Sequence, residues 1–526
     1  MAFQSARRLK VVLVSPEVLG FAKTGGLADV SVALPRALAS RGHQCTIVTP
    51  LSRSARHGPV PLQATEKELG VPIGNKEVTG RLYRAVLPDT EVPVYLIEQR
   101  DYFERDDPRC GRGLYDYVAG DGKRRPYSDN SERYIFFCRA VLEALEALPF
   151  WPDILHCNDW QTGLIPVYLR EVYCQRGDDE QRNRYANIAT VLTIHNLAYQ
   201  GLFWHWDMLL TGLDWRLFNY RELEFYGQLN FLKGGIVFAD RVTTVSPRYA
   251  AEIQTPYFGC GLHGVLWERR ASLSGIVNGL DESVWDPARD GYLAANYDAE
   301  TVGVGKPICK ADLQRRFNLA PNASTCVLGV VSRLVDQKGA DLLCEAAEAM
   351  MQQDVQLVVL GEGNPVYERM FIDLSRRFPD RIGVRIGFDE ALAHQIEAGA
   401  DIFLMPSLYE PSGLNQLYSM RYGTVPVVRA TGGLADTVIG YDGKASDVES
   451  ATGFVFQAPS AEALLDALCR ALCVFRNEPE IWRRLMMNGM KQDWSWSRSA
   501  AEYERIFFEL QKERVLVVDG RRNQGR

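Results

Sequence analysis

The sequence predicts an α/β protein built from two doubly wound, Rossmann-like domains. A chain of 526 residues is longer than a single hydrophobic core normally supports. Short apolar runs of strand length alternate with helical patterns in both halves. The word Thr-Gly-Gly-Leu-Ala-Asp occurs at residues 24–29 and again at 431–436. Because the residues around the two copies do not repeat, we interpret the word as one device used by each of two lobes.

The first half opens with a βαβ unit. Residues 9–15 are an apolar run, residues 27–41 have helical spacing that ends at Gly42, and residues 45–50 are again apolar and β-branched. Further strands are predicted at residues 153–157, 190–194 and 241–245.

The second half alternates more regularly. Strands are predicted at residues 327–331, 356–360, 382–386, 402–405 and 425–428. Helices are predicted between them near Leu342, Glu368, Leu392 and Leu417. This alternation is typical of a doubly wound sheet.

The domain boundaries follow from these elements. We place the N-terminal domain at residues 1–272 and the C-terminal domain at residues 273–499, with the boundary just before the strand that leads to Asn278. A helix predicted at residues 500–512 is expected to pack back on the N-terminal domain. Residues 513–526 are expected to form a tail that ends in disorder.

The composition excludes several classes of protein. The net charge of −7 provides no basic field for a nucleic acid, and no run approaches the roughly 18 apolar residues of a membrane span. The eleven cysteines lack the paired spacing of a zinc site and indicate a reducing compartment. The apolar run near the N-terminus is too short for a secretory signal. We therefore expect a protein that is not secreted and binds neither nucleic acid nor membrane.

Two absent motifs shape the expected chemistry. The sequence has no P-loop, which argues against nucleoside triphosphate hydrolysis, and no Asp-x-Asp pair to hold Mg²⁺ against a diphosphate. Residues 259–264 match a Rossmann fingerprint, but Pro256 stands where a strand should deliver the turn, so we discount the match. The charge of a bound diphosphate should therefore be met by basic side chains and helix N-termini, with no metal.

Glycine pairs and cations mark a candidate anion site. In each copy of the repeated word, a threonine and two glycines precede a helical pattern, which places backbone N–H groups at the positive end of a helix dipole. Arg333 and Lys338 follow a strand, and open α/β sheets bind ligands at that edge. Lys23 precedes the first glycine pair. The alternative is ordinary surface charge, but the combination favours a diphosphate site.

Carboxylate and imidazole groups also follow predicted strands. Glu410 lies on the loop after the strand that ends at Met405, where a carboxylate can cap a helix or hold sugar hydroxyls. The neighbouring diphosphate site favours the second role. Asp159 and His195 follow two strands of the first half. A lone histidine is usually structural, but two polar strand ends at one edge favour a site.

Nine aromatic residues lie between Tyr199 and Tyr226 at irregular spacing. We expect most of them to belong to the core. A few are expected to form a cleft wall, where their rings would suit the flat apolar faces of glucose units.

Together these motifs resemble those of the bacterial glycogen synthases and plant starch synthases, which are retaining glycosyltransferases of the GT-B fold. The segments that carry the resemblance are residues 23–29, 158–160, 195–201, 278–281, 332–339, 410–413 and 431–436. The resemblance implies two Rossmann-like domains that face a deep interdomain cleft. It also implies transfer of glucose from ADP-glucose to the non-reducing end of an α-1,4-glucan with retention of configuration, no cofactor, and a location in the bacterial cytoplasm or the plastid stroma.

The resemblance also assigns roles to residues. Arg333 and Lys338 would neutralise the departing diphosphate, and Glu410 would hold the glucose hydroxyls. His195 would contact the 6-hydroxyl, and Asp159 would line the sugar pocket. The other donor-binding positions implied are Lys23, Gly25, Gly26, Asp29, Asn278, Gly387, Phe388, Ser412, Gly413, Leu414, Thr431, Gly432 and Gly433, with Phe388 on the nucleobase. The acceptor-binding positions implied are Glu17, Asp129, Asn130, Trp160 and Tyr199.

Two other functions stay open at this point. One is a GT-B transferase that uses a UDP-sugar, of the sucrose- or trehalose-phosphate type. The other is a non-catalytic glucan-binding homologue, although the presence of Lys23, Arg333, Lys338 and Glu410 argues against it. The sequence does not indicate an oligomeric state.

Overall fold

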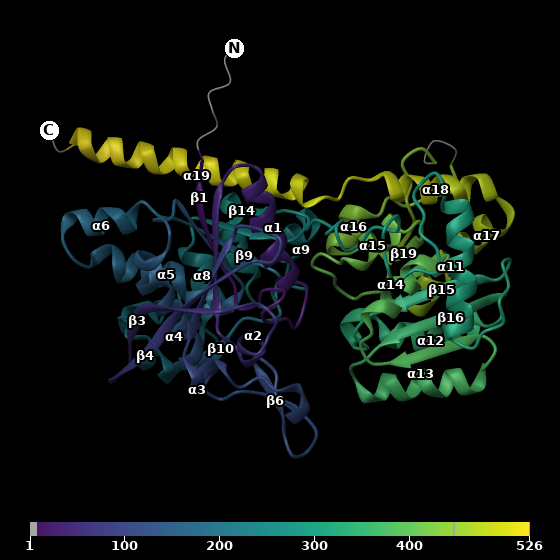
Figure 1. Cartoon of the computed structure of the whole chain (residues 1–526), viewed down its shortest axis with the longest axis horizontal. Coiled ribbons are helices and arrows are strands. Elements are labelled where there is room, and N and C mark those ends of the chain that lie inside the picture. Colours follow the sequence, from purple (N-terminus) through teal and green to yellow (C-terminus); the bar gives the residue numbers. More distant parts are fainter. Residues whose placement is uncertain (1–7, 445–447, 525–526) are drawn as a thin grey trace, which may run out of the picture. The chain divides into compact units, whose positions relative to one another are not determined.

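The computed structural model describes residues 8–444 and 448–524 and divides the chain into two compact units. The first unit comprises the described residues up to Val245, Ala250–Gly279 and the described residues from Trp496 onward. The second unit comprises Ser246–Tyr249 and the described residues of Leu280–Ser495. Each unit is a sheet covered by helices (Figure 1).

The main sheet of the first unit has the strand order β14-β13-β9-β8-β1-β2-β5-β4-β3. Its strands are β1 (Lys10–Val14), β2 (Gln44–Pro50), β3 (Gln63–Ile73), β4 (Lys76–Val86), β5 (Pro93–Glu98), β8 (Ile154–Asn158), β9 (Ala189–Ile194), β13 (Arg241–Thr244) and β14 (Leu273–Gly275). From β14 to β5 neighbouring strands are parallel, and the β3–β4 hairpin adds two antiparallel strands at one edge. The predicted strands of this half are thus confirmed.

The helices and small strands of the first unit lie between and beyond these strands. The helices are α1 (Leu27–Ser40), α2 (Arg53–Arg56), α3 (Arg100–Phe103), α4 (Asn130–Ala144), α5 (Leu164–Glu171), α6 (Asp179–Ala186), α7 (Met208–Thr211), α8 (Phe231–Phe238), α9 (Pro247–Glu252, shared with the second unit), α10 (His263–Glu268) and α19 (Trp496–Gln524). The small strands are β6 (Asp116–Val118), β7 (Arg124–Pro126), β10 (Leu202–Trp204), β11 (Glu224–Phe225) and β12 (Gln228–Asn230).

The second unit is a six-stranded parallel sheet with the order β17-β16-β15-β18-β19-β20. Its strands are β15 (Cys326–Val331), β16 (Val355–Gly361), β17 (Ile382–Ile386), β18 (Ile402–Met405), β19 (Val425–Arg429) and β20 (Phe454–Phe456). Its helices are α11 (Val302–Arg316), α12 (Ala340–Met350), α13 (Pro365–Arg377), α14 (Glu390–Gly399), α15 (Asn415–Arg421), α16 (Gly432–Thr437), α17 (Ala461–Asn477) and α18 (Pro479–Lys491).

Alternate residues of β15 face two different cores. Leu328 and Val330 pack in the core that contains residues of α12 and α17, whereas Val327 packs in the core that contains residues of α11 and α14. Burial on both faces explains why this strand is a continuous apolar run in the sequence. It also confirms the doubly wound sheet predicted for this half.

The first unit extends farther along the chain than the sequence indicates. We expected the boundary after residue 272, but β14 pairs in parallel with β13, which keeps residues 273–279 in the first unit. Asn278 therefore belongs to the first unit rather than to the second. The strand before Asn278 was predicted, but the pattern of a short strand does not show which of two sheets it joins, so it was assigned to the wrong domain.

The C-terminal helix α19 packs on the first unit, as expected (Figure 1, yellow). Tyr503 and Phe507 are buried in the same core as residues of α1, and Glu504 accepts hydrogen bonds from Arg41 and His43. The expected bounds of 500–512 were too narrow, because the helix runs from Trp496 to Gln524. The expected tail at 513–526 is therefore helical up to Gln524, and residues 525–526 lie outside the described residues.

The aromatic segment around β10 and β12 was assigned to the core incorrectly. Six of its nine aromatic side chains are exposed, namely Tyr199, Trp204, Trp206, Trp215, Tyr220 and Tyr226. Trp204 lies in β10, and Tyr226 lies between β11 and β12, in a separate three-stranded sheet with the order β10-β12-β11. Aromatic content indicates burial only on average, since the local fold decides which face meets solvent.

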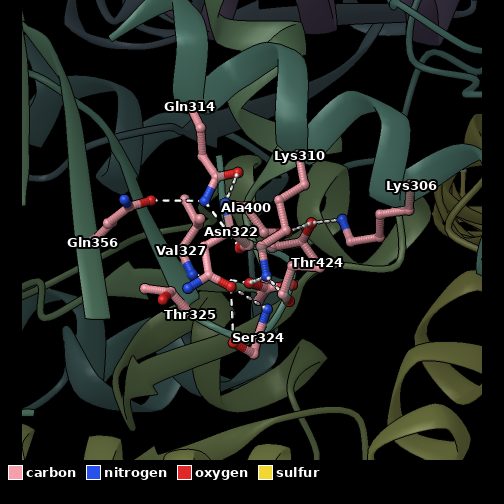
Figure 2. Close-up of polar contacts among 12 residues, drawn as sticks. Lys306, Lys310, Gln314, Asn322, Ser324, Thr325, Val327, Gln356, Ala400 and Thr424 are labelled. Atoms are coloured by element: carbon pink, nitrogen blue, oxygen red, sulfur yellow. Dashed lines mark hydrogen bonds and ion pairs between the residues drawn. The ribbon is translucent and has the colours of Figure 1, made fainter. Parts of the chain in front are cut away.

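One face of α11 carries polar side chains into the second unit (Figure 2). Lys306, Lys310 and Gln314 follow one another at four-residue spacing, so they share a face of the helix, and all three are buried. The ammonium of Lys306 donates to the Thr424 hydroxyl at 2.5 Å, and burial lowers the pKa of Lys306 to about 8. Lys310 pairs with Asp401 at 2.7 Å. Hydrogen bonds and an ion pair therefore hold this helix against the sheet.

Candidate active site

In the first unit, three adjacent parallel strands end in polar groups. Strand β1 leads to Glu17, β8 leads to Asp159, and β9 leads to His195. Because the strands are parallel neighbours, their carboxyl ends share one edge of the sheet. The structure therefore brings together two of the predicted catalytic residues and one predicted acceptor residue.

The carboxylate of Glu17 holds the first glycine turn. It accepts hydrogen bonds from the N–H of Thr24 at 2.5 Å, the hydroxyl of Thr24 at 2.5 Å and the N–H of Gly25 at 3.2 Å. Gly26 is the N-cap of α1, as its place in the repeated word predicts. In this structure the Gly25 N–H therefore donates to a carboxylate of the protein itself, and its predicted contact with a phosphate stays a prediction.

Glu17 is in turn held by a buried hydrogen-bond network. The hydroxyl of Tyr115 donates to Glu17 at 2.8 Å, and the carbonyl of Tyr115 accepts from Asn130. The Asn130 oxygen accepts from the buried guanidinium of Arg133 at 2.6 Å. Asn130, which was predicted to bind the acceptor, therefore supports Glu17 indirectly, through its hydrogen bond to Tyr115.

Three further predicted acceptor residues have different surroundings. Asp129 accepts two hydrogen bonds from Arg105, at 2.8 and 2.7 Å. Trp160 is only 8% exposed and packs edge-on against Tyr134. Tyr199 is 54% exposed. Of these three, Tyr199 offers the largest surface to a ligand.

A hydrogen bond joins the Asp159 side chain to the backbone of His195. The Asp159 carboxylate accepts the His195 N–H at 2.7 Å, and Asp159 has a φ of 57°, a left-handed conformation that is unusual for a residue other than glycine. Burial raises the pKa of the Asp159 carboxyl to about 7, against the opposing effect of the N–H groups of His195 and Asn196. Such a pKa is typical of a functional carboxyl in a site.

The His195 ring is a neutral hydrogen-bonding group. Burial lowers its pKa to about 3. Its Nε2 lies 2.9 Å from the Asn158 Oδ1, while the Asn158 amide donates to the Val14 carbonyl. Since Oδ1 can only accept, Nε2 carries the proton, and Nδ1 is left as an acceptor suited to a sugar hydroxyl.

The raised pKa of Asp159 predicts a measurable pH dependence of stability. A carboxyl whose pKa is about 7 when folded and about 3.8 when unfolded favours the folded state fully below pH 3.8, and this contribution is lost as the pH rises to 7. We expect Asp159→Asn, which can still accept the His195 N–H, to lose less stability than the wild type between pH 5 and pH 8. Denaturation midpoints at the two pH values measure the difference, and parallel losses in both proteins would contradict the prediction.

In the second unit, two predicted catalytic residues form an ion pair. The Lys338 ammonium lies 2.5 Å from the Glu410 carboxylate, and the two side chains are 21% and 7% exposed. The Ser407 hydroxyl also donates to Glu410, at 3.1 Å. Arg333 is exposed just after β15, and among the described residues none forms a hydrogen bond or ion pair with its guanidinium. Two cationic side chains, Arg333 and Lys338, thus follow β15, and the Lys338 ammonium forms an ion pair with the buried carboxylate of Glu410.

The second glycine pair lets two loops approach closely. A Cβ at Gly432 would lie 1.9 Å from the Glu410 carbonyl oxygen, and a Cβ at Gly433 would lie 1.8 Å from the Ser412 carbonyl oxygen. The Gly433 N–H donates to the Glu410 carbonyl at 3.0 Å. The glycines are required for packing, the Gly433 amide is bonded to the Glu410 carbonyl in this structure, and the donor-binding role of this pair stays a prediction.

The remaining predicted donor positions fall into two groups. Thr431, Ser412 and the N-cap residue Leu414 belong to the tightly packed loops around Glu410, together with Gly413, whose φ is +67°. Beyond these loops, Phe388 is 81% exposed after Gly387, and Lys23 pairs with Asp29 at 2.8 Å. The buried Oδ1 of Asn278 has no hydrogen-bond partner among the described residues, which suits a hydroxyl donor from a ligand.

Two features bear on metals and disulfides. Among residues 8–444 and 448–524, no group of three or more His, Cys, Asp or Glu side chains is arranged to hold a metal ion. All eleven cysteines lie in the described ranges and are free.

The fold and the site define a class. Each unit is Rossmann-like, and each presents charged and polar side chains at the carboxyl ends of parallel strands, where such sheets bind ligands. This combination is that of a GT-B glycosyltransferase.

Comparisons with known proteins agree with this class. Residues 10–268 match the starch synthase catalytic domain, and residues 313–473 match glycosyl transferases group 1. Glycogen synthase 1 of Methylococcus capsulatus is 45% identical over 504 residues, which cover 95% of this chain and 96% of that protein. The catalytic domain of starch synthase IV from Arabidopsis thaliana, bound to ADP and acarbose, is 31% identical with a TM-score of 0.84 and covers 96% of this chain and 100% of that chain. The sucrose-phosphate synthase of Thermosynechococcus elongatus, 19% identical with a TM-score of 0.56 over 96% of this chain and 99% of its own, shares the fold alone.

The chain belongs to the glycogen and starch synthase family, and its function is that of a glycogen or starch synthase. This confirms the family and the GT-B fold class expected from the sequence, and it argues against an enzyme of the sucrose- or trehalose-phosphate type. In the described part of the chain, no helix has the length and apolar character needed to span a bilayer.

One residue of the site was missed by sequence reasoning. Gln416 is completely buried directly after the Glu410 loop and contacts the backbone of that loop. A buried glutamine inside a helix pattern carries no distinctive signal in a single sequence, because its partners are backbone carbonyls.

Proposed function

We propose that this glycosyltransferase moves glucose from ADP-glucose to the non-reducing end of an α-1,4-glucan with retention of configuration and without a metal ion. The observation that carries the proposal is the ion pair between Lys338 and the buried Glu410 at the strand ends of the second unit. The relatives named glycogen synthase and the starch synthase IV structure with bound ADP and acarbose support the same donor and acceptor.

The second unit supplies the groups that the donor requires. Breaking the bond between the sugar and the diphosphate leaves negative charge on the phosphate oxygens, which Arg333 and Lys338 would stabilise. Glu410 already accepts hydrogen bonds from Lys338 and Ser407, so its side chain is oriented, and its oxygens would accept hydrogen bonds from glucose hydroxyls. The ion pair keeps both groups oriented before the donor binds.

The first unit supplies groups for the transferred sugar. The Nδ1 of His195 is an acceptor for the 6-hydroxyl, and the Asp159 carboxyl lies beside it. A phosphate oxygen of the leaving diphosphate takes the proton from the attacking hydroxyl of the glucan as the new glycosidic bond forms. No separate base on the protein is needed for this step.

The donor and the product test the proposal directly. With glycogen as acceptor, we expect kcat/KM to be higher for ADP-glucose than for UDP-glucose, and we expect the added glucose to be released by a hydrolase specific for α-1,4 bonds. Turnover should be unchanged after treatment with EDTA. A preference for UDP-glucose, a β-linked product, or EDTA inactivation that only added metal reverses would each contradict the corresponding part of the proposal. No incorporation of labelled glucose from either donor would favour the non-catalytic alternative.

A further inference from the structure

The Gln416 side chain connects the Glu410 loop to α16, which begins at the second glycine pair. Gln416 lies in the first turn of α15 and is completely buried. Its amide nitrogen lies 3.2 Å from the Ser412 carbonyl, 3.0 Å from the Gly413 carbonyl and 3.1 Å from the Thr437 hydroxyl. The three partners belong to the loop and to α16.

The connection closes into a ring of hydrogen bonds. The Thr437 hydroxyl donates to the Gly433 carbonyl at 2.6 Å, and the Gly433 N–H donates to the Glu410 carbonyl at 3.0 Å. Gln416 therefore reaches Glu410 by two routes, one through the loop backbone and one through Thr437 and Gly433. Both routes end at the residue that pairs with Lys338.

The orientation of the Gln416 amide follows from its partners. Two of them are carbonyls that can only accept, and the Thr437 hydroxyl uses its hydrogen on Gly433, so all three face the NH₂ group of Gln416, whose two N–H donors are shared among them. The Gln416 oxygen faces Gly413, where an added Cβ would lie 2.5 Å from it. The absence of a side chain at Gly413 thus leaves space for this amide.

We propose that Gln416 is a positioning residue for the donor, which holds the 410–413 loop so that Glu410 meets both Lys338 and the sugar hydroxyls. This inference rests on the proposed function of the Glu410 loop. A loop displaced by about 1 Å can cost on the order of 10²-fold in rate, because reacting groups must be held in a narrow geometry.

The test replaces Gln416 by methionine, which has nearly the same shape but donates no hydrogen bond. We expect KM for ADP-glucose and the Kd for ADP, measured by calorimetry, to rise at least about 10-fold, because the loop is no longer fixed. KM for glycogen should stay within about twofold, since loss of loop geometry affects the donor side. Thr437→Val, which removes only the bridging hydroxyl, should shift the donor constants in the same direction by a smaller factor.

Gln314→Met is the matched control. Gln314 is also a buried glutamine of the second unit, and it bonds to Gln356 and Asn322 rather than to the loop. The Gln314→Met variant should have a lower melting temperature, because it loses buried hydrogen bonds, but its KM for ADP-glucose should be unchanged. A Gln416→Met enzyme with wild-type donor KM and ADP affinity would overturn the inference, as would equal donor effects in Gln314→Met. If Gln416→Met does not fold, unchanged donor constants in Thr437→Val would overturn it.

The readouts separate this inference from the proposed function. A wild-type protein that transfers no glucose would refute the proposed function, and ADP affinity would still decide the role of Gln416. A wild-type enzyme that transfers glucose, with variants unaltered in donor constants, would refute only the inference.

Discussion

Replacing Lys338 by alanine is expected to lower turnover by a factor of about 10² or more, as is typical when a group that stabilises transition-state charge is removed. The change takes a cation from the proposed diphosphate site and also leaves the Glu410 carboxylate, 7% exposed, with Ser407 as its remaining side-chain partner. Both effects act on the same chemical step. Steady-state kinetics with ADP-glucose and glycogen measure the loss, and circular dichroism confirms the fold.

Lys76→Ala is the matched control for Lys338→Ala. Lys76 forms an ion pair of similar length, 2.6 Å from Glu132, but its side chain is 57% exposed. Since exposed ion pairs contribute roughly 0–1 kcal/mol, turnover and stability should stay close to wild type. Near-normal turnover of a folded Lys338→Ala enzyme would remove Lys338 from the catalytic set and, with it, the observation on which the proposed function rests.

Replacing Asp401 by alanine is expected to lower the free energy of unfolding of the second unit by about 3–5 kcal/mol, the usual cost of breaking a buried ion pair. Asp401 accepts from Lys310 at 2.7 Å and from the Val327 N–H at 2.8 Å. Its loss leaves the Lys310 ammonium, whose side chain is 7% exposed, without its counter-ion and frees a backbone donor of β15. Urea denaturation of the full chain, analysed for the transition of this unit, gives the loss.

Arg316→Ala serves as the control on the same helix. Arg316 pairs with Asp312 at 2.6 Å, one turn away, and its side chain is 48% exposed. Pairs of this kind contribute about 0.2–0.5 kcal/mol, so the unfolding transition should barely move. A loss of less than about 1 kcal/mol for Asp401→Ala would show that water or a shift of α11 compensates the buried lysine, and that the polar face of this helix is not what holds it.

The sequence predicted the parts of the fold whose pattern is local. Parallel strands such as β15 and β16 are buried on both faces, so they are apolar runs that can be recognised one at a time. The β3–β4 hairpin was missed because many of its residues are exposed or half-buried, so neither strand is a continuous apolar run in the sequence. The strand before Asn278 was predicted but assigned to the second domain, because an apolar pattern does not identify the strand with which it pairs, and this placed the boundary seven residues too early.

Candidate site residues were predictable to the extent that position along the chain implies position in the sheet. Asp159 and His195 follow neighbouring parallel strands, so their meeting at one edge follows from the topology. Position along the chain did not predict the exposure of the aromatic segment or the hydrogen-bond partners of the glycine amides. Glu17 accepts the Gly25 N–H from eight residues away, and Gly433 donates to the Glu410 carbonyl from the first turn of α16.

The amino-acid sequence by itself determined the class of fold, the family and which strand ends carry the charged groups, because these depend on periodicity and on short motifs. Only the tertiary structure decided that Lys338 pairs with Glu410, that the second glycine pair serves close packing, and that Gln416 joins the two loops. The physical reason is that hydrogen bonds and close contacts between distant segments depend on distances of a few tenths of an ångström, which no local pattern encodes.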